Sequence, residues 1–246
     1  MPTTWTVKIP GSSVTLAGAA PPSQPDDLQL VVAHVIRIAT DRLVEADLAL
    51  REWLTLYGSL RDLDEDGRRL LHLYARAHLL ALDQIREFLL TLEKLLLIEP
   101  QLSAVTTLSD VYDQAFGPLS EIRNSVMHLG DRFRLVRQGE KPIAVPQGDA
   151  SVGHMITGDG SYIAGRRIGA RFISDVTVVA GKAVSWGGFF DDRYHVLTKD
   201  GSIAEFPLRP SNLPIAAGVV QQVVDAFAKA PFAWAGGERI VSRTFA

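Results

Sequence analysis

The residues with the clearest chemical potential form the hexapeptide RNSVMH, from Arg123 to His128. An arginine offers a fixed fork of N–H donors that suits phosphate oxygens, and it stays charged at any working pH. A histidine titrates near neutrality and can take a proton from a ribose 2′-hydroxyl or return one to a leaving 5′-oxygen. These two side chains could cleave RNA without a metal, because together they transfer protons and stabilise a charged phosphorane.

The hexapeptide lies in the fourth helix that the sequence predicts. Pro118 suits the first turn of this helix, which we expect to run to about Arg137. At about 100° per residue, one stripe of the helix is apolar and should face the core: Leu119, Ile122, Val126, Leu129 and Phe133. The opposite stripe is polar: Glu121, Asn124, His128 and Asp131. Arg123 lies on a flank between the two, and His128 is predicted to be exposed.

Three further helices are predicted before the motif. Apolar residues at i, i+3 and i+4 indicate one long helix over 26–58 and a second that starts after the acidic cluster at 62–67 and runs toward Pro100. Ser109 is predicted to cap a short third helix that ends near Phe116. Because a short loop joins the two long helices, we expect them to pack as an antiparallel pair.

The segments on either side of the helices are predicted to form strands. Before them, Trp5 to Ile9 and Val14 to Leu16 precede a Pro-rich linker, and this arm can pair with a sheet elsewhere. After Gly139 the chain alternates short β-branched runs with turn signals, which indicates an antiparallel meander. The expected strands are 154–157, 161–163, 170–173, 176–179, 183–186, 194–198 and 202–206. A last helix, introduced by Asn212 and Pro214, is expected to close the meander.

Composition narrows the functional class. The chain has 246 residues, 47% of them hydrophobic, and a formal net charge of -3, which argues against a strongly cationic nucleic-acid binder. The absence of cysteine excludes disulfides, thiolate zinc sites and cysteine nucleophiles. Neither a signal peptide nor a membrane-spanning helix is predicted, so we expect no membrane association and, by default, a cytoplasmic protein.

Other chemical motifs are weak. The run DLDEDG, from Asp62 to Gly67, begins like an EF-hand calcium loop, but its twelfth position is Leu73 where a glutamate should lie. We interpret it as the N-terminus of the second helix, with Asp62 and Glu65 forming a capping box. The six histidines show no metal-site spacing, and neither a phosphate-binding loop nor a serine-hydrolase elbow is present. No metal or cofactor is expected.

The order of the helices and the motif resemble the HEPN superfamily. In that family an arginine, a polar residue and, four positions later, a histidine lie near the start of the last helix of a four-helix unit. The resemblance covers roughly residues 26 to 137. It implies that Arg123 and His128 are catalytic and that Asn124 orients the site. The downstream sequence HLGDR, which includes Asp131 and Arg132, also resembles that of an uncharacterised branch of the family that carries a small β-appendage. Asp131, Arg132 and Glu121 are candidates for supporting roles in the site.

We therefore expect an α+β chain: an N-terminal arm over residues 1–25, a HEPN-like helical bundle over 26–138, and a β-meander with a C-terminal helix over 139–246. By resemblance, the leading function is a metal-independent endoribonuclease that acts as a homodimer on RNA, in a defence or toxin–antitoxin setting. The alternative is a non-catalytic dimeric scaffold that uses the bundle for dimerisation and the β-part for an unidentified protein partner.

Overall fold

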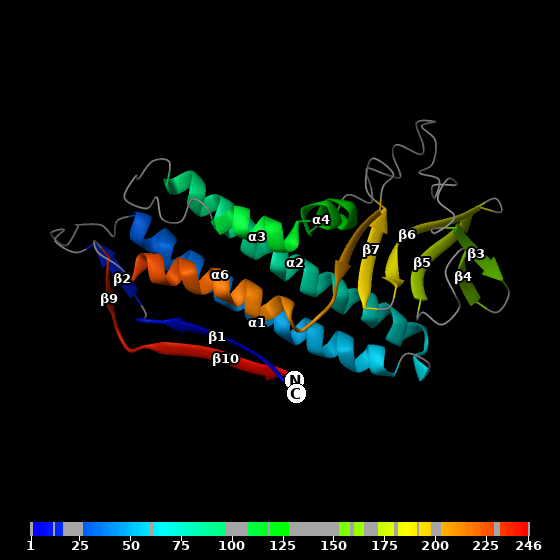
Figure 1. Ribbon diagram of the computed structural model, residues 1–246, viewed down its shortest axis with the longest axis horizontal. Coiled ribbons are helices and arrows are strands. Elements are labelled where there is room, and N and C mark those ends of the chain that lie inside the picture. Colours follow the sequence, from blue (N-terminus) through cyan, green and yellow to red (C-terminus); the bar gives the residue numbers. More distant parts are fainter. Residues whose placement is uncertain are drawn as a thin grey trace. The chain divides into compact units, whose positions relative to one another are not determined.

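The computed structural model describes residues 2–11, 13–16, 27–59, 62–96, 108–117, 119–127, 153–157, 160–164, 172–179, 182–190, 192–197, 203–228 and 232–245. Within these ranges the chain is α+β, as predicted, with helices and small antiparallel sheets (Figure 1). Contacts between Cα atoms divide it into two compact units. The first comprises Met1–Glu52, Ala77–Gly117 and Pro210–Ala246, and the second comprises Trp53–Arg76 and Pro118–Arg209. Both predicted domain boundaries, after residues 25 and 138, lie outside the described residues.

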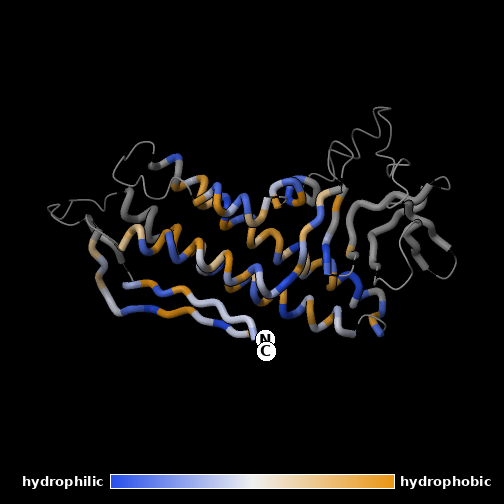
Figure 2. Tube along the Cα trace, in the orientation of Figure 1, coloured by the Kyte–Doolittle hydropathy of each residue, from blue (hydrophilic) through white to orange (hydrophobic). Residues whose placement is uncertain are grey.

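The two long helices form where the periodicity predicts them. Helix α1 spans Asp27–Gly58 and α2 spans Glu65–Leu96, and each contributes residues to both units. In the first unit they pack antiparallel through a buried apolar face, and the Nδ1 atom of His78 on α2 lies 2.8 Å from the carbonyl oxygen of Ala46 on α1. Figure 2 shows hydrophobic residues recurring along both helices, as an amphipathic pattern requires.

Helix α2 is capped by Asp64, and the predicted Asp62–Glu65 capping box is wrong by two residues. Because the helix begins at Glu65, Asp64 occupies the N-cap position, and its Oδ1 atom accepts the backbone N–H of Gly67 at 2.8 Å. The backbone N–H of Asp62 donates instead to the carbonyl of Ser59 at 2.9 Å. The Oδ1 atom of Asp64 therefore stabilises the N-terminus of α2, as expected from the interpretation of DLDEDG as a helix start.

Two short helices follow. Helix α3 spans Leu108–Phe116, so Ser109, the predicted cap, lies inside the helix and is buried. Helix α4 spans Leu119–Met127 and carries the first part of the motif. The predicted continuation of this helix to Arg137 lies outside the described residues.

The N-terminal arm pairs with strands at the C-terminal end of the chain that the sequence pattern did not predict. In the first unit β1 (Thr3–Ile9) pairs antiparallel with β10 (Arg239–Phe245), and β2 (Ser13–Leu16) pairs antiparallel with β9 (Phe232–Ala235). We call this two-part ladder the terminal ribbon. Trp5, Val7 and Ile9 point into the core, whereas the residues between them are exposed or half-buried.

The predicted C-terminal helix exists, but its expected role was wrong. Helix α6 spans Asn212–Phe227 and belongs to the first unit, where its Cα atoms contact β1 and α3, and the chain then continues into β9 and β10. Its Gln221 side chain accepts the backbone N–H of Lys8 at 2.7 Å and donates to the Lys8 carbonyl at 3.2 Å. Gln221 thus covers the edge of β1 that β10 leaves open.

The second unit contains the meander. Strands β5 (Phe172–Val179), β6 (Lys182–Phe190), β7 (Arg193–Leu197) and β8 (Ile203–Pro207) pair in sequence order, all antiparallel. The predicted strands 170–173 and 176–179 are one strand, because a register shift between Ser174 and Val176 interrupts its alternation without ending its pairing.

A separate hairpin precedes the meander in the same unit. It pairs β3 (Gly153–Thr157) with β4 (Gly160–Ala164), and the register brings Thr157 opposite Gly160. The predicted pairing of these two strands is therefore confirmed, although the Asp159 turn residue lies outside the described residues.

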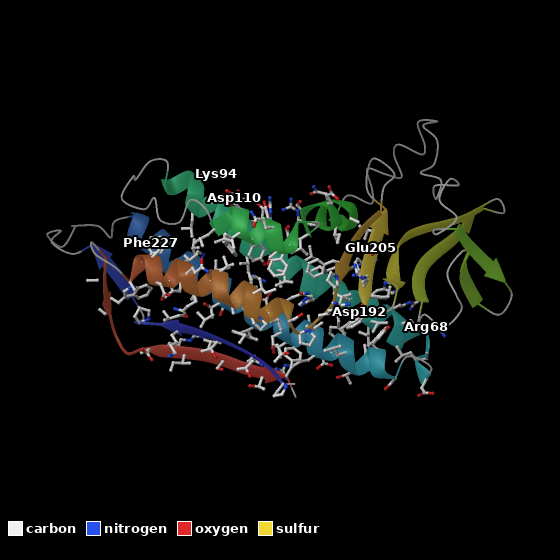
Figure 3. The ribbon with its side chains drawn as sticks, in the orientation of Figure 1. Arg68, Lys94, Asp110, Asp192, Glu205 and Phe227 are labelled. Atoms are coloured by element: carbon white, nitrogen blue, oxygen red, sulfur yellow. The ribbon has the colours of Figure 1, made fainter. Side chains whose placement is uncertain are left out.

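An aromatic cluster forms the core of the second unit. The Phe189 ring on β6 lies 5.1 Å from Tyr194, 5.6 Å from Trp53 and 4.8 Å from His72, measured between ring centroids. At the solvent side, Arg193 pairs with Glu205 at 3.5 Å, and Asp192 accepts a hydrogen bond from Arg209 (Figure 3). The bond from Arg209 lowers the pKa of Asp192 below its ordinary value. One face of the meander is therefore core and the other is polar.

Candidate functional site

Helix α4 presents the first two motif residues on its polar side. Leu119 and Ile122, the two members of the predicted apolar stripe whose burial the structure describes, are each 1% exposed. Glu121 and Asn124 are exposed, and Arg123 is half-buried, which matches its predicted place on the flank. The burial of α4 therefore follows the helical wheel from Leu119 to Asn124.

The side chains of Arg123 and Asn124 are joined. The Nη2 and Nε atoms of the guanidinium donate to the Oδ1 atom of Asn124, at 3.2 and 3.4 Å. The amide oxygen thus orients the plane of the arginine fork at the polar surface of α4. An oriented guanidinium has lost part of its rotamer freedom before a ligand arrives, which lowers the entropic cost of binding a phosphate.

The remaining predicted site residues fall elsewhere. His128, Asp131 and Arg132 lie outside the described residues, so the arrangement of the histidine around Arg123 stays a prediction. Glu121 lies on α4 two residues before Arg123, exposed to solvent. The structure therefore brings together Arg123 and Asn124 and places Glu121 on the same short helix.

Sequence reasoning missed a buried carboxylate in the first unit. Asp47 on α1 is fully buried and accepts hydrogen bonds from the Trp5 indole and from the Arg51 guanidinium, and it lies 3.6 Å from Arg243 of β10. Arg51 also donates to the carbonyl of Thr244 at 2.8 Å. We call these residues the Asp47 cluster. It links α1 to strands β1 and β10 of the terminal ribbon, and its partners are too far apart in the chain to form a recognisable motif.

A second polar cluster fixes α3 on α2. Arg86 forms a two-point ion pair with Asp113, with Nη2 2.8 Å from Oδ2, and the Tyr112 hydroxyl donates to the Leu82 carbonyl at 2.7 Å. Hydrogen bonding to Asp113 raises the pKa of Arg86, and burial raises the pKa of Tyr112. Both groups therefore keep their protons near neutral pH, and the cluster anchors the helix that directly precedes α4.

His78 is a buried histidine at the interface of α1 and α2. It is fully buried, and burial lowers its pKa to about 4, against smaller opposing effects of the Ala46 carbonyl and Asp47. Its Nε2 atom has no hydrogen-bond partner among the described residues. A neutral imidazole that donates from Nδ1 to Ala46 fits this geometry. The residue belongs to the packing of the helix pair.

No group of three or more histidine, cysteine, aspartate or glutamate side chains among the described residues is placed to hold a metal ion. None of the described helices combines the length and the apolar character that crossing a membrane requires.

No known family, curated protein or solved structure matches this chain. The likeness to the HEPN superfamily therefore rests on the motif and the order of the helices.

Proposed function

We propose that the chain is a metal-independent endoribonuclease of the HEPN type that acts as a homodimer. The observation that supports it most directly is the bond between Arg123 and Asn124 on the polar side of a helix whose opposite side is buried. The proposed chemistry requires an arginine that is oriented to bind phosphate, on a helix that the rest of the unit holds in place.

The proposed reaction needs only side chains. His128 takes the proton of a ribose 2′-hydroxyl, and the oxygen attacks the adjacent phosphorus while Arg123 stabilises the phosphorane charge. The 5′-oxygen leaves with a proton from an imidazolium, so the products are a 2′,3′-cyclic phosphate and a 5′-hydroxyl. A second copy of the motif in the dimer supplies the second imidazole.

The test is cleavage of a defined RNA in excess chelator. The parent is compared with His128→Ala and Arg123→Ala, and the matched controls are His34→Ala and Arg68→Ala, which alter exposed residues of the same types. We expect both motif variants to lose at least about a hundredfold in rate and both controls to cleave like the parent. Substituting 2′-deoxyribose at the cleaved nucleotide should abolish cleavage.

Two outcomes contradict the proposal. If the parent does not cleave RNA while it forms a dimer, the non-catalytic scaffold becomes the better interpretation. If the motif variants cleave as well as the two controls, the activity belongs to a contaminant or to another site.

A further inference from the structure

The helix that carries the motif packs on the meander in the second unit. Cα atoms of α4 lie within 8 Å of Cα atoms in both β7 and β8. Figure 1 shows α4 beside one end of this strand pair. Its buried residues Leu119 and Ile122 are the apolar positions that such support requires. The meander is therefore part of the same packing unit as the motif.

One cross-strand pair of β7 and β8 is both small and buried. Val196 of β7 lies directly opposite Ala204 of β8, and these side chains are 1% and 5% exposed. The adjacent pair on the same face, Tyr194 and Phe206, is large, and Tyr194 accepts a hydrogen bond from Arg76 of α2 at 3.1 Å. Packed elements lie about 8–10 Å apart, depending on the side chains between them, so a close approach favours small residues.

The support of α4 bears directly on the motif. Ile122, on its buried face, precedes Arg123 in the same helical turn, so a shift or rotation of α4 against the strands moves the guanidinium by a similar distance. Displacing a substrate-binding group by about 1 Å can cost about a hundredfold in rate. The packing volume beneath α4 can therefore control the activity of a site that it does not touch.

We propose that Val196 and Ala204 are positioning residues, which hold α4 at the height and rotation that Arg123 needs to stabilise the phosphorane charge. This inference rests on the proposed RNase function and assigns the meander a role in that site. The two residues act through the helix and contact no substrate. Their combined volume, rather than the identity of either residue, is the property that matters.

The cross-strand geometry allows a volume-conserving test. Val196→Ala opens space beneath α4, Ala204→Val fills it, and the double variant V196A/A204V exchanges the two side chains across the ladder and restores the total volume. The matched control is Val220→Ala, the same truncation at a residue of α6 that is 2% exposed and belongs to the first unit.

Two readouts separate position from activity. Because the chain has no cysteine, Ser120→Cys on α4 and Leu73→Cys on α2, both in the second unit, accept one spin label each. We expect each single variant to shift or broaden the distance between the labels. We also expect kcat for RNA to fall about tenfold with KM within about twofold of the parent. The double variant should recover both, and Val220→Ala should change neither.

The inference is overturned if the single variants keep the parental label distance, or if the double variant recovers neither property. It also fails if Val220→Ala lowers kcat as much as Val196→Ala, since the loss would then be one of general stability. The label distance is independent of RNA cleavage. If the parent does not cleave RNA, the RNase proposal fails, and the support of α4 by Val196 and Ala204 is judged on the distance alone.

Discussion

The indole Nε1 atom of Trp5 donates a hydrogen bond of 3.0 Å to the buried carboxylate of Asp47, 42 positions later in the chain. The same carboxylate accepts from Arg51 at 2.8 Å, and the guanidinium of Arg51 lies 4.1 Å from the centroid of the Phe245 ring. One side chain of α1 therefore holds the first strand of the chain through Trp5, and the last strand both through its ion pair with Arg243 and through Arg51. A buried charge of this kind is stable only while its partners remain in place.

Removing the Asp47 carboxylate should destabilise the first unit strongly. Asp47→Ala leaves Arg51, Arg243 and the Trp5 indole without their shared acceptor, and we expect a loss of about 3 kcal/mol in the free energy of unfolding. Trp5→Phe removes a single donor and should cost less. Urea unfolding measures both. The control is Asp41→Ala, which removes an exposed carboxylate from the same helix and should change stability by no more than about 0.5 kcal/mol. Equal losses at Asp47 and Asp41 would contradict the assigned role.

Two glycines should respond to alanine in opposite directions. A Cβ atom at Gly11 would lie 2.6 Å from the backbone oxygen of Ala235, so Gly11→Ala should force the terminal ribbon apart and cost about 1–3 kcal/mol. Gly218 lies in α6 with no atom within 4 Å of a Cβ, so Gly218→Ala should gain about 0.5–1 kcal/mol through helix propensity. Thermal unfolding of the two variants beside the parent gives the signs. A gain at Gly11 would show that the ribbon can yield there, and a loss at Gly218 would contradict the expected gain in helix propensity.

The ion pair between Arg86 and Asp113 should contribute more than a surface pair. The Arg86 side chain is only 18% exposed and is held at two points, so Asp113→Asn leaves a partly buried guanidinium with a weaker acceptor. We expect a loss of about 1–2 kcal/mol. Asp110→Asn, at an exposed position of the same helix (Figure 3), is the control and should be nearly neutral. If high salt abolishes the difference between the two variants, the pair is screened and behaves as exposed.

Local periodicity predicted the elements and missed how they join. The helices over 27–58 and 65–96 and the order of the meander follow from apolar spacing and turn residues, which are local properties. Strand β10, with the sequence RIVSRTF, is short and half polar, and it pairs with β1 at the other end of the chain. Pairing between strands so far apart in the sequence leaves no periodic signal. Because this pairing was not predicted, the preceding meander was the element that α6 was expected to cover.

In the candidate site, too, the sequence predicted the local features and missed those that depend on rotamers and tertiary packing. The helical wheel correctly buried Leu119 and Ile122 and exposed Asn124, because a helix face is a local property. The bond between the Arg123 and Asn124 side chains depends on rotamers that a wheel does not contain. Support of α4 by β7 and β8 depends on tertiary packing, and the sequence pattern had treated the meander as an appendage.

The stability of the helix pair should depend on pH through His78. Burial lowers its pKa to about 4 in the folded chain, whereas an unfolded histidine titrates near about 6.5. As the pH falls from about 6.5 to 4, the unfolded chain takes up a proton that the folded chain refuses, so the free energy of unfolding decreases over this window. Above about 6.5 both states are neutral and this contribution is constant. The shift corresponds to about 3 kcal/mol lost by pH 4.

Replacing the imidazole isolates this effect from the carboxylates that titrate in the same window. His78→Leu fills a similar volume without a titratable group, so its free energy of unfolding should fall by about 3 kcal/mol less than that of the parent between pH 6.5 and pH 4. His34→Leu, at an exposed position of α1, should retain the parental pH dependence. Urea unfolding at closely spaced pH values gives the three curves. Parallel curves for the parent and His78→Leu would contradict the lowered pKa, because the imidazole would then take up its proton in the folded chain as well. That uptake requires water or a rearranged acceptor at Nε2.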